Sequence, residues 1–279
     1  MLKLERPTNS ALDTFILSIS KVRNTDLSNR LVAAADVIAA ESAFYDAAGT
    51  LQNLHLVQRM APVVAVTKDE MEAVYTQRMA GLKGPGRPIY DEIFASAPNG
   101  RCPLCGHRNV MTLDHHLPKA HYPALAVAPL NLVPSCSDCN KAKLAGFPTT
   151  PEEVGIHPYY DDVDNETWLV ASVMSTSPSA LLFDVQNVVA WDPILMQRVR
   201  NHFQSLALSS LYASQAADEL LNIKYSLSQV HIAGGMDAVR EELTMKAISC
   251  RHARPNGWRT AAYSAWATDD WFCNSGFNA

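Results

Sequence analysis

The chain has 279 residues, of which 48% are hydrophobic and 18% are charged, and its formal net charge at pH 7 is −5. Its length suits one large domain or two moderate ones with a real core, and its composition argues against a chain that is disordered over most of its length. The acidic balance excludes nucleic-acid binding through overall positive charge, because basic contacts normally supply most nonspecific affinity for phosphates.

The N-terminal segment, Met1 to Ser20, carries charged residues between its apolar ones. It therefore lacks the uninterrupted apolar stretch of a signal peptide. The most apolar segment, Leu31 to Ala40, is interrupted by Asp36. It is also much shorter than the roughly 20 residues needed to cross a bilayer. We expect a cytoplasmic protein without a membrane-spanning segment.

Residues 1–80 are predicted to form a helical N-terminal region. Apolar residues recur there at helical spacing, and Thr67 followed by Glu70 has the spacing of a capping box at the start of a helix. Residues 81–100 are rich in glycine and proline. They are predicted to form a connector that includes a short helix near Ile89 to Ala95.

Four of the six cysteines form two C-x-x-C pairs separated by 30 residues. The pairs are Cys102 with Cys105 and Cys136 with Cys139. In a cytosolic chain, two matched pairs predict a tetrahedral zinc site with four thiolate ligands, and the alternatives are a redox dithiol or chance clustering. A closed four-cysteine site leaves no open coordination position, so we expect this zinc to be structural. By itself it identifies no activity.

The central segment also differs from the rest of the chain in charge. Residues 101–146 contain five basic and two acidic side chains, whereas the remainder contains 18 basic and 26 acidic ones. The local charge is therefore +3, against −8 elsewhere. Any face that binds nucleic acid is predicted to lie on or near the central segment.

Three polar side chains of the central segment predict a second, different metal site. The local structure that we expect is two strands followed by a helix that packs across them: residues 110–114, 131–134 and 137–144. Asp114 at the end of a strand and Asn140 on the facing helix supply hard oxygen ligands, which predicts Mg²⁺ or Mn²⁺. His115 points away from Asp114 in extended backbone, so we expect a general base rather than a ligand.

Three short segments, taken in order, resemble the HNH, or ββα-metal, nuclease motif: Leu113-Asp114-His115-His116, Asn131-Leu132-Val133-Pro134 and Cys139-Asn140. The arrangement of the zinc cysteines is similar to that of endonuclease VII of phage T4. The resemblance covers residues 101–146. It implies a zinc-stabilised ββα-metal module at residues 101–160. Helical periodicity on both sides then predicts an α+β, predominantly helical chain in which helical regions flank this module.

The resemblance also implies an activity. A protein similar to these nucleases hydrolyses phosphodiester bonds of DNA and leaves 5′-phosphate and 3′-hydroxyl ends, with His115 taking a proton from the attacking water. Asn131 matches the central asparagine of the motif, whose side chain braces the loop between the strands and so positions His115. The alternative for Asn131 is an ordinary turn asparagine.

Four further side chains are candidates for substrate binding. Lys119, Lys141 and Lys143 are predicted to contact phosphates, although exposed lysines are common on a small metal-bound domain. His157 lies beyond the motif and is followed by a proline. It is predicted to return to the site and contact a phosphate, with a buried histidine bonded to backbone as the alternative.

Residues 161–279 are predicted to be mainly helical. Asp192 is followed by a proline and opens a strong helical pattern as a good N-cap. Two more helices are predicted near Met236 to Ile248 and near Gly257 to Trp271. Two segments could be short strands or core turns, which periodicity does not decide: Trp168 to Met174 and Leu181 to Val189.

Two other functions remain open from the sequence. One is a non-catalytic, zinc-stabilised module that binds nucleic acid or protein, and the other is an HNH ribonuclease, because the same ion and base can attack either backbone. The acidic flanks suggest a homo-oligomer or a protein partner that supplies DNA affinity. More loosely, the arrangement resembles the HNH subunits of bacterial anti-phage systems such as Septu, which implies an ATPase partner and a role in defence.

Overall fold

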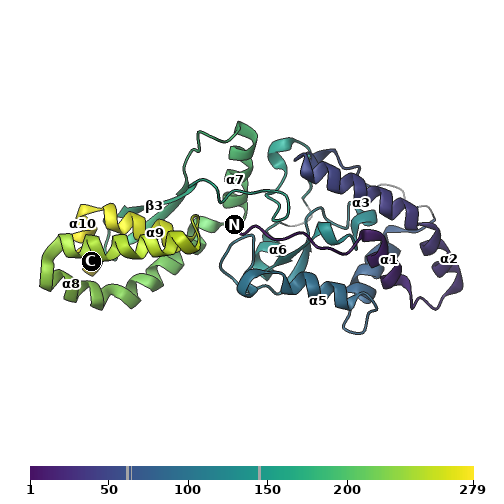
Figure 1. The fold of residues 1–279 in the computed structure, drawn as a ribbon, viewed down its shortest axis with the longest axis horizontal. Helices are drawn as coiled ribbons and strands as arrows, with labels where there is room; N and C mark the ends of the chain where they lie inside the picture. The colour runs from purple at the N-terminus through teal and green to yellow at the C-terminus, as the bar shows by residue number, and fades with distance from the viewer. Residues whose placement is uncertain (61–62, 64, 144–145) are drawn as a thin grey trace. The chain divides into compact units, whose positions relative to one another are not determined.

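The chain divides into two compact units in the computed structural model, Leu2–Asp161 and Asp162–Ala279, and Met1 groups with the second. Figure 1 shows the elements of each unit in chain order. The structure describes residues 1–60, 63, 65–143 and 146–279. Among these residues, the chain is mainly helical with two small two-stranded sheets, an α+β fold. None of the helices described is both long enough and apolar enough to cross a membrane.

The N-terminal unit begins with helices that polar side chains cap. The Ser10 side chain accepts from the backbone N–H of Asp13, and the Asn24 side chain accepts from that of Leu27. Such caps satisfy backbone donors that have no partner within the helix. The predicted helical region is confirmed for these elements, and its residues 61–62 and 64 lie outside the described part. Its first three helices are α1 (Ala11–Ile19), α2 (Thr25–Ala33) and α3 (Ala35–Thr50).

A second group of helices leads toward the central segment: α4 (Lys68–Ala73), the π-helix η2 (Val74–Met79) and α5 (Arg87–Ala95). The predicted capping box is present, because Thr67 and Glu70 each bond the other's backbone N–H. Arg30 then holds both carboxylate oxygens of Glu70 at 2.7 and 2.8 Å. This bidentate contact fixes α2 against the start of α4.

The central segment contains two antiparallel strands followed by a helix: β1 (Thr112–His115), β2 (Leu132–Ser135) and α6 (Ser137–Lys143). Asp114 pairs with Val133 and His115 with Leu132. The first strand begins two residues later than predicted, because the N–H of Val110 bonds the carbonyl of Gly100 in a preceding turn. His115 therefore belongs to the strand. Leu144, the last residue of the predicted helix, lies outside the described residues.

The segments 1–80, 81–100 and 101–160 form one unit, which differs from the separate parts that we drew from the sequence. Side chains of all three segments share one hydrophobic core cluster, so the glycine-rich connector does not separate them. Members of this core come from all three segments: Phe15, Leu31, Ile38, Met71, Ile89, Ile93, Leu113 and Leu132.

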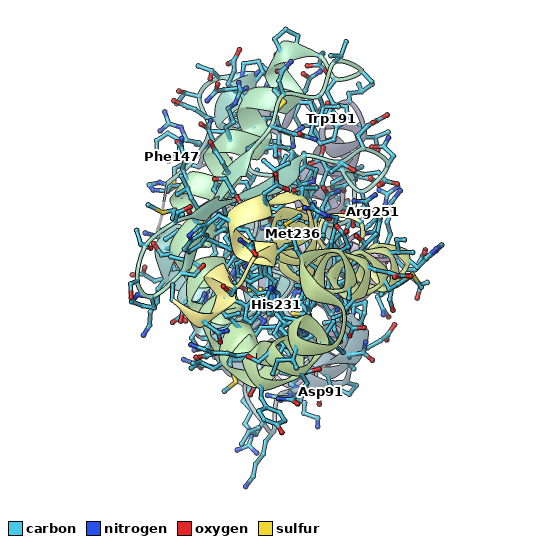
Figure 2. The ribbon with its side chains drawn as sticks, turned by 90° about the vertical axis from the view of Figure 1, so that its left-hand side faces the viewer. Asp91, Phe147, Trp191, His231, Met236 and Arg251 are labelled. Atoms are coloured by element: carbon cyan, nitrogen blue, oxygen red, sulfur yellow. The ribbon has the colours of Figure 1, made fainter. Side chains whose placement is uncertain are left out.

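The C-terminal unit combines a hairpin with helices: β3 (Leu169–Met174), β4 (Ala180–Val185), α7 (Pro193–Ser205), α8 (Leu208–Ala253), α9 (Trp258–Thr268) and α10 (Asp270–Cys273). Both segments of undecided periodicity are thus strands, and Asp192 caps α7 as predicted. The helix predicted near Met236 is only the second half of α8. Gly235, with φ of +68°, interrupts α8, and His231 and Met236, labelled in Figure 2, lie on either side of it.

A buried asparagine ties the loops of this unit together. The side-chain oxygen of Asn256 accepts from the N–H groups of Trp168 and Leu169, at 2.9 and 3.2 Å. Its amide nitrogen donates to the carbonyls of Val163 and Glu166. One side chain therefore joins the turn before α9 to the entry of β3.

Candidate functional site

The four cysteines of the two C-x-x-C pairs meet in the N-terminal unit. All four are buried, and their sulfur atoms lie within 4.8 Å of one another. The first pair lies on a turn before β1, and the second lies where β2 passes into α6. The turns are 30 residues apart in the chain, so tertiary structure brings them together.

Local backbone contacts shape the two cysteine turns. Gly106 adopts φ of +64°, a conformation that favours glycine, and its N–H bonds the carbonyl of Cys102 at 2.7 Å. On the second turn the N–H of Cys139 points at the sulfur of Cys136, 3.4 Å away. An ion pair of 2.8 Å between Arg108 and Asp138 joins the turns across the cluster.

This cluster fits a structural metal such as zinc. A Zn–S distance of about 2.3 Å in a tetrahedron separates the sulfur atoms by roughly 3.8 Å, within the spread observed here. Hydrogen bonds among the four thiols lower the pKa of Cys105 and Cys136 and raise that of Cys102 and Cys139, because the thiols share their protons. Four protein ligands would close the coordination sphere.

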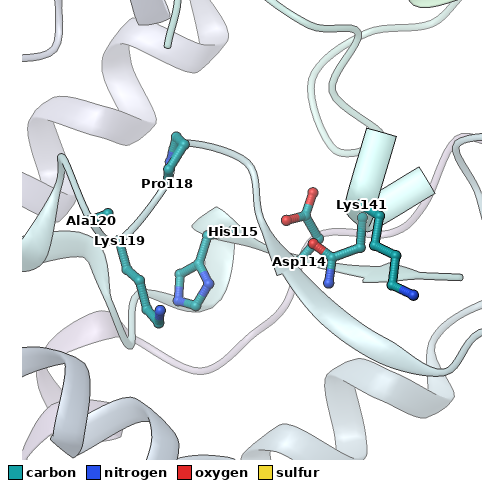
Figure 3. Close-up of a pocket in the computed structure, with 7 residues that line it drawn as sticks. Asp114, His115, Pro118, Lys119, Ala120 and Lys141 are labelled. Carbon is teal, nitrogen blue, oxygen red and sulfur yellow. The ribbon is translucent and has the colours of Figure 1, made fainter. Parts of the chain in front are cut away.

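A pocket of about 360 Å³ opens beside the end of β1, and Figure 3 shows the side chains that line it. Asp114, His115 and Asn140 line the pocket, together with Lys119 and Lys141. In this view His115 lies between Lys119 and Asp114. The structure therefore brings the predicted carboxylate, imidazole and amide to one opening, the first two from β1 and the third from α6.

His115 is held in one orientation and one charge state. Its Nε2 lies 2.8 Å from the carbonyl oxygen of Ala126. A carbonyl only accepts, so Nε2 carries the proton and Nδ1 is the nitrogen left to accept one. Burial lowers the pKa of His115 to about 3, so the ring is neutral at pH 7.

Tyr75 packs against His115, a contact that our sequence analysis missed. The two rings meet edge to face with centroids 4.3 Å apart. Burial raises the pKa of the Tyr75 hydroxyl, which donates to the carbonyl of Leu113 at 3.2 Å. The π-helix η2 carries Tyr75, and short π-helical segments are frequent at functional sites. The capping box before it predicts a helix but not this turn.

Asn131 is fully buried behind the pocket and bonds the loop that follows β1. Its side-chain oxygen accepts from the N–H of Leu117 at 2.7 Å. Its amide nitrogen donates to the carbonyls of Leu117 and Leu125, at 3.0 and 3.2 Å. Since Leu125 precedes Ala126, the residue that orients the imidazole of His115, these bonds fix the backbone on which that orientation depends.

The three predicted phosphate-binding lysines have different surroundings. Lys143 lies 3.0 Å from an Asp114 carboxylate oxygen and 2.5 Å from the carbonyl of His115. Lys119 lines the pocket and lies 3.5 Å from a Glu72 carboxylate oxygen. Lys141 is exposed at the pocket rim.

His157 is a correction to our prediction of a phosphate contact. It is 1% exposed, and it does not belong to the residues that line the pocket. Its Nε2 lies 2.9 Å from the Tyr45 hydroxyl, and its Nδ1 accepts from the N–H of Tyr159. Its ring also packs on that of His116, with centroids 4.1 Å apart. The buried alternative, a histidine bonded to backbone, therefore describes it.

No protein-family model and no solved structure matches the chain. A curated protein does: the chain is 30% identical over 238 residues to Protein ea31 of Escherichia phage lambda. The match covers 80% of this chain and 80% of the phage protein. It includes most of both sequences, so it extends well beyond the cysteine turns and the pocket. The chain therefore belongs to the family of phage lambda Protein ea31.

Proposed function

We propose that this protein is a metal-dependent endonuclease of the HNH type that hydrolyses phosphodiester bonds of DNA. The observation that carries the proposal is the meeting of Asp114, His115 and Asn140 at one pocket, on two antiparallel strands and the helix that follows them. A carboxylate, a neutral imidazole and an amide oxygen together suit phosphodiester hydrolysis assisted by one divalent ion.

The donor set fits a hard cation. Asp114 offers a carboxylate and Asn140 an amide oxygen, the ligand types that Mg²⁺ and Mn²⁺ take in proteins. A pocket of about 360 Å³ leaves room for water and phosphate oxygens beside them. When bound there, the ion would neutralise the charge that develops on the phosphate and on the leaving oxygen.

His115 would act as the general base through Nδ1. The bond from its Nε2 to Ala126 prevents the ring from turning, and burial keeps Nδ1 unprotonated at neutral pH. Nδ1 would take a proton from the water that attacks phosphorus while the bond to the 3′-oxygen breaks. The products would be a 5′-phosphate and a 3′-hydroxyl. Asn131 would position the loop and would touch neither metal nor substrate.

The chain outside residues 101–146 is acidic, which supports a need for an assembly partner. Residues outside 101–146 carry 18 basic and 26 acidic side chains and would repel DNA over most of the surface. An oligomer or a partner protein would then supply DNA affinity. Because a member of the family occurs in phage lambda, we propose the reaction and not a defensive role.

A cleavage assay on the zinc-loaded protein tests the reaction. We expect nicking of plasmid DNA that requires added Mg²⁺ or Mn²⁺ and that His115→Ala slows by about 10²-fold or more. The assay should include single-stranded DNA, duplex DNA and RNA, with and without proteins encoded beside this one. Cleavage of RNA alone would establish the ribonuclease alternative. Binding without cleavage of any substrate, at full zinc content, would establish the binding module instead.

A further inference from the structure

Lys143 holds the same carboxylate that the proposed catalytic metal would use. Its Nζ lies 3.0 Å from Oδ2 of Asp114 and 2.5 Å from the backbone oxygen of His115. Lys143 and Asn140 are three residues apart on α6 and therefore share a face of that helix. The ammonium thus lies among the groups proposed to bind the metal.

The contact is partly shielded from water. The exposed fraction is 12% for the Asp114 side chain and 24% for that of Lys143. A carboxylate oxygen and a backbone carbonyl are also two of the ligand types that hard divalent cations prefer. The Lys143 ammonium therefore contacts the same two oxygens that a bound divalent cation would contact.

A divalent ion and the ammonium would compete for Asp114. Two positive charges a few ångströms apart repel strongly where water is partly excluded. Lys119 differs, because its ammonium lies near Glu72 and not near Asp114. The four-carbon stem of Lys143 allows its ammonium to move while the helix stays in place.

We propose that Lys143 exchanges between Asp114 and a phosphate oxygen of the substrate, so that the metal and the phosphodiester bind cooperatively. Without a phosphodiester, a metal that reaches Asp114 displaces Lys143 into water. With one bound, the displaced ammonium gains an anionic partner. By linkage, the phosphodiester then tightens metal binding and the metal tightens phosphodiester binding by the same factor. This inference rests on the proposed function.

The test measures Mn²⁺ binding to the full-length, zinc-loaded protein by electron paramagnetic resonance, with and without dimethyl phosphate as the phosphodiester. Lys143→Met removes the charge and keeps most of the stem. Lys21→Met is the matched control, since it makes the same charge change at an exposed lysine of the same unit that does not line the pocket. Asp114→Asn removes the proposed carboxylate ligand, so the Mn²⁺ binding that is lost in this variant is the binding at this site. Lys143→Gln serves as a second variant that removes the charge. The rise in melting temperature on adding Mn²⁺ serves as a second measurement of Mn²⁺ binding.

We expect Lys143→Met to bind Mn²⁺ about tenfold more tightly than wild type, and Lys21→Met to change the affinity less than about twofold. Dimethyl phosphate should tighten Mn²⁺ binding in wild type but not in Lys143→Met. If Asp114-dependent binding exists and Lys143→Met does not strengthen it, the exchange is wrong and the nuclease proposal stands. If no variant binds Mn²⁺ through Asp114, the metal site is wrong and both proposals fail.

Discussion

Each unit of this protein contains a buried asparagine that bonds backbone groups of distant loops. Asn131 does so in the N-terminal unit and Asn256 in the C-terminal unit, through several hydrogen bonds each. Asn131 fixes the loop that orients His115 at the pocket, whereas Asn256 fixes the entry of β3. The comparison teaches that a buried asparagine bonded to backbone groups does not by itself indicate a functional site. Its importance depends on the side chain that it positions.

The largest expected effect is the loss of zinc when a cysteine of the N-terminal unit is replaced, compared with a cysteine of the C-terminal unit. Cys139→Ser should remove the structural metal and unfold the central segment, because metal binding contributes several kcal/mol to folding at such sites. Zinc content measured by mass spectrometry should fall from about one per chain to near zero. Cys250→Ser in the C-terminal unit is the control and should retain zinc. Equal zinc in both variants would exclude the cluster as the metal site.

The next largest effect is on the cleavage rate of a variant that keeps its zinc and its fold. His115→Ala should lower the cleavage rate by about 10²-fold to 10⁴-fold, since a general base contributes that much, and should leave zinc content unchanged. His252→Ala changes an exposed histidine of the C-terminal unit and should cleave as wild type does. Because the pKa of His115 is about 3, its protonation should not slow the reaction between pH 8 and pH 5. Wild-type cleavage by His115→Ala would remove it from the mechanism.

The two asparagines allow a direct test of the opening comparison. Asn131→Ala and Asn256→Ala should each lower the free energy of unfolding by about 2–4 kcal/mol, because each leaves buried backbone groups without a partner. Only Asn131→Ala should also slow cleavage, by about 10-fold to 100-fold, through displacement of His115. Urea unfolding and cleavage rates measured on the same samples check both effects. Equal loss of cleavage in the two variants would contradict the distinction.

The smallest effect concerns Glu70, which caps the helix leading to Tyr75. Hydrogen bonds from Arg30 lower the pKa of Glu70 from 4.5 to about 2. A depressed carboxyl pKa stabilises the folded state above pH 4.5, and this stabilisation is lost as the pH falls toward 2. Glu70→Gln should therefore have a lower melting temperature than wild type at pH 7, with the difference shrinking below pH 4.5. Glu5→Gln, which removes an exposed carboxylate of the same unit, is the control.

Local signals predicted much of the fold. The capping residues Thr67 and Asp192 each begin a helix where the sequence placed one, because a cap acts within a single turn. The strands around Asp114 were predicted to within two residues. The shared core of the N-terminal unit was not predicted, since periodicity shows which face of an element is apolar and not which element covers it.

The candidate site divides in the same way. The sequence by itself determined which side chains are candidates for metal binding and chemistry: paired cysteines, a carboxylate, an imidazole and an amide at spacings typical of metal sites. Only the tertiary structure decided that His115 bonds Ala126, that Lys143 pairs with Asp114 and that His157 is buried. These contacts join residues far apart in the chain, and they depend on how loops close and pack. Residue type and local spacing contain no information about that packing.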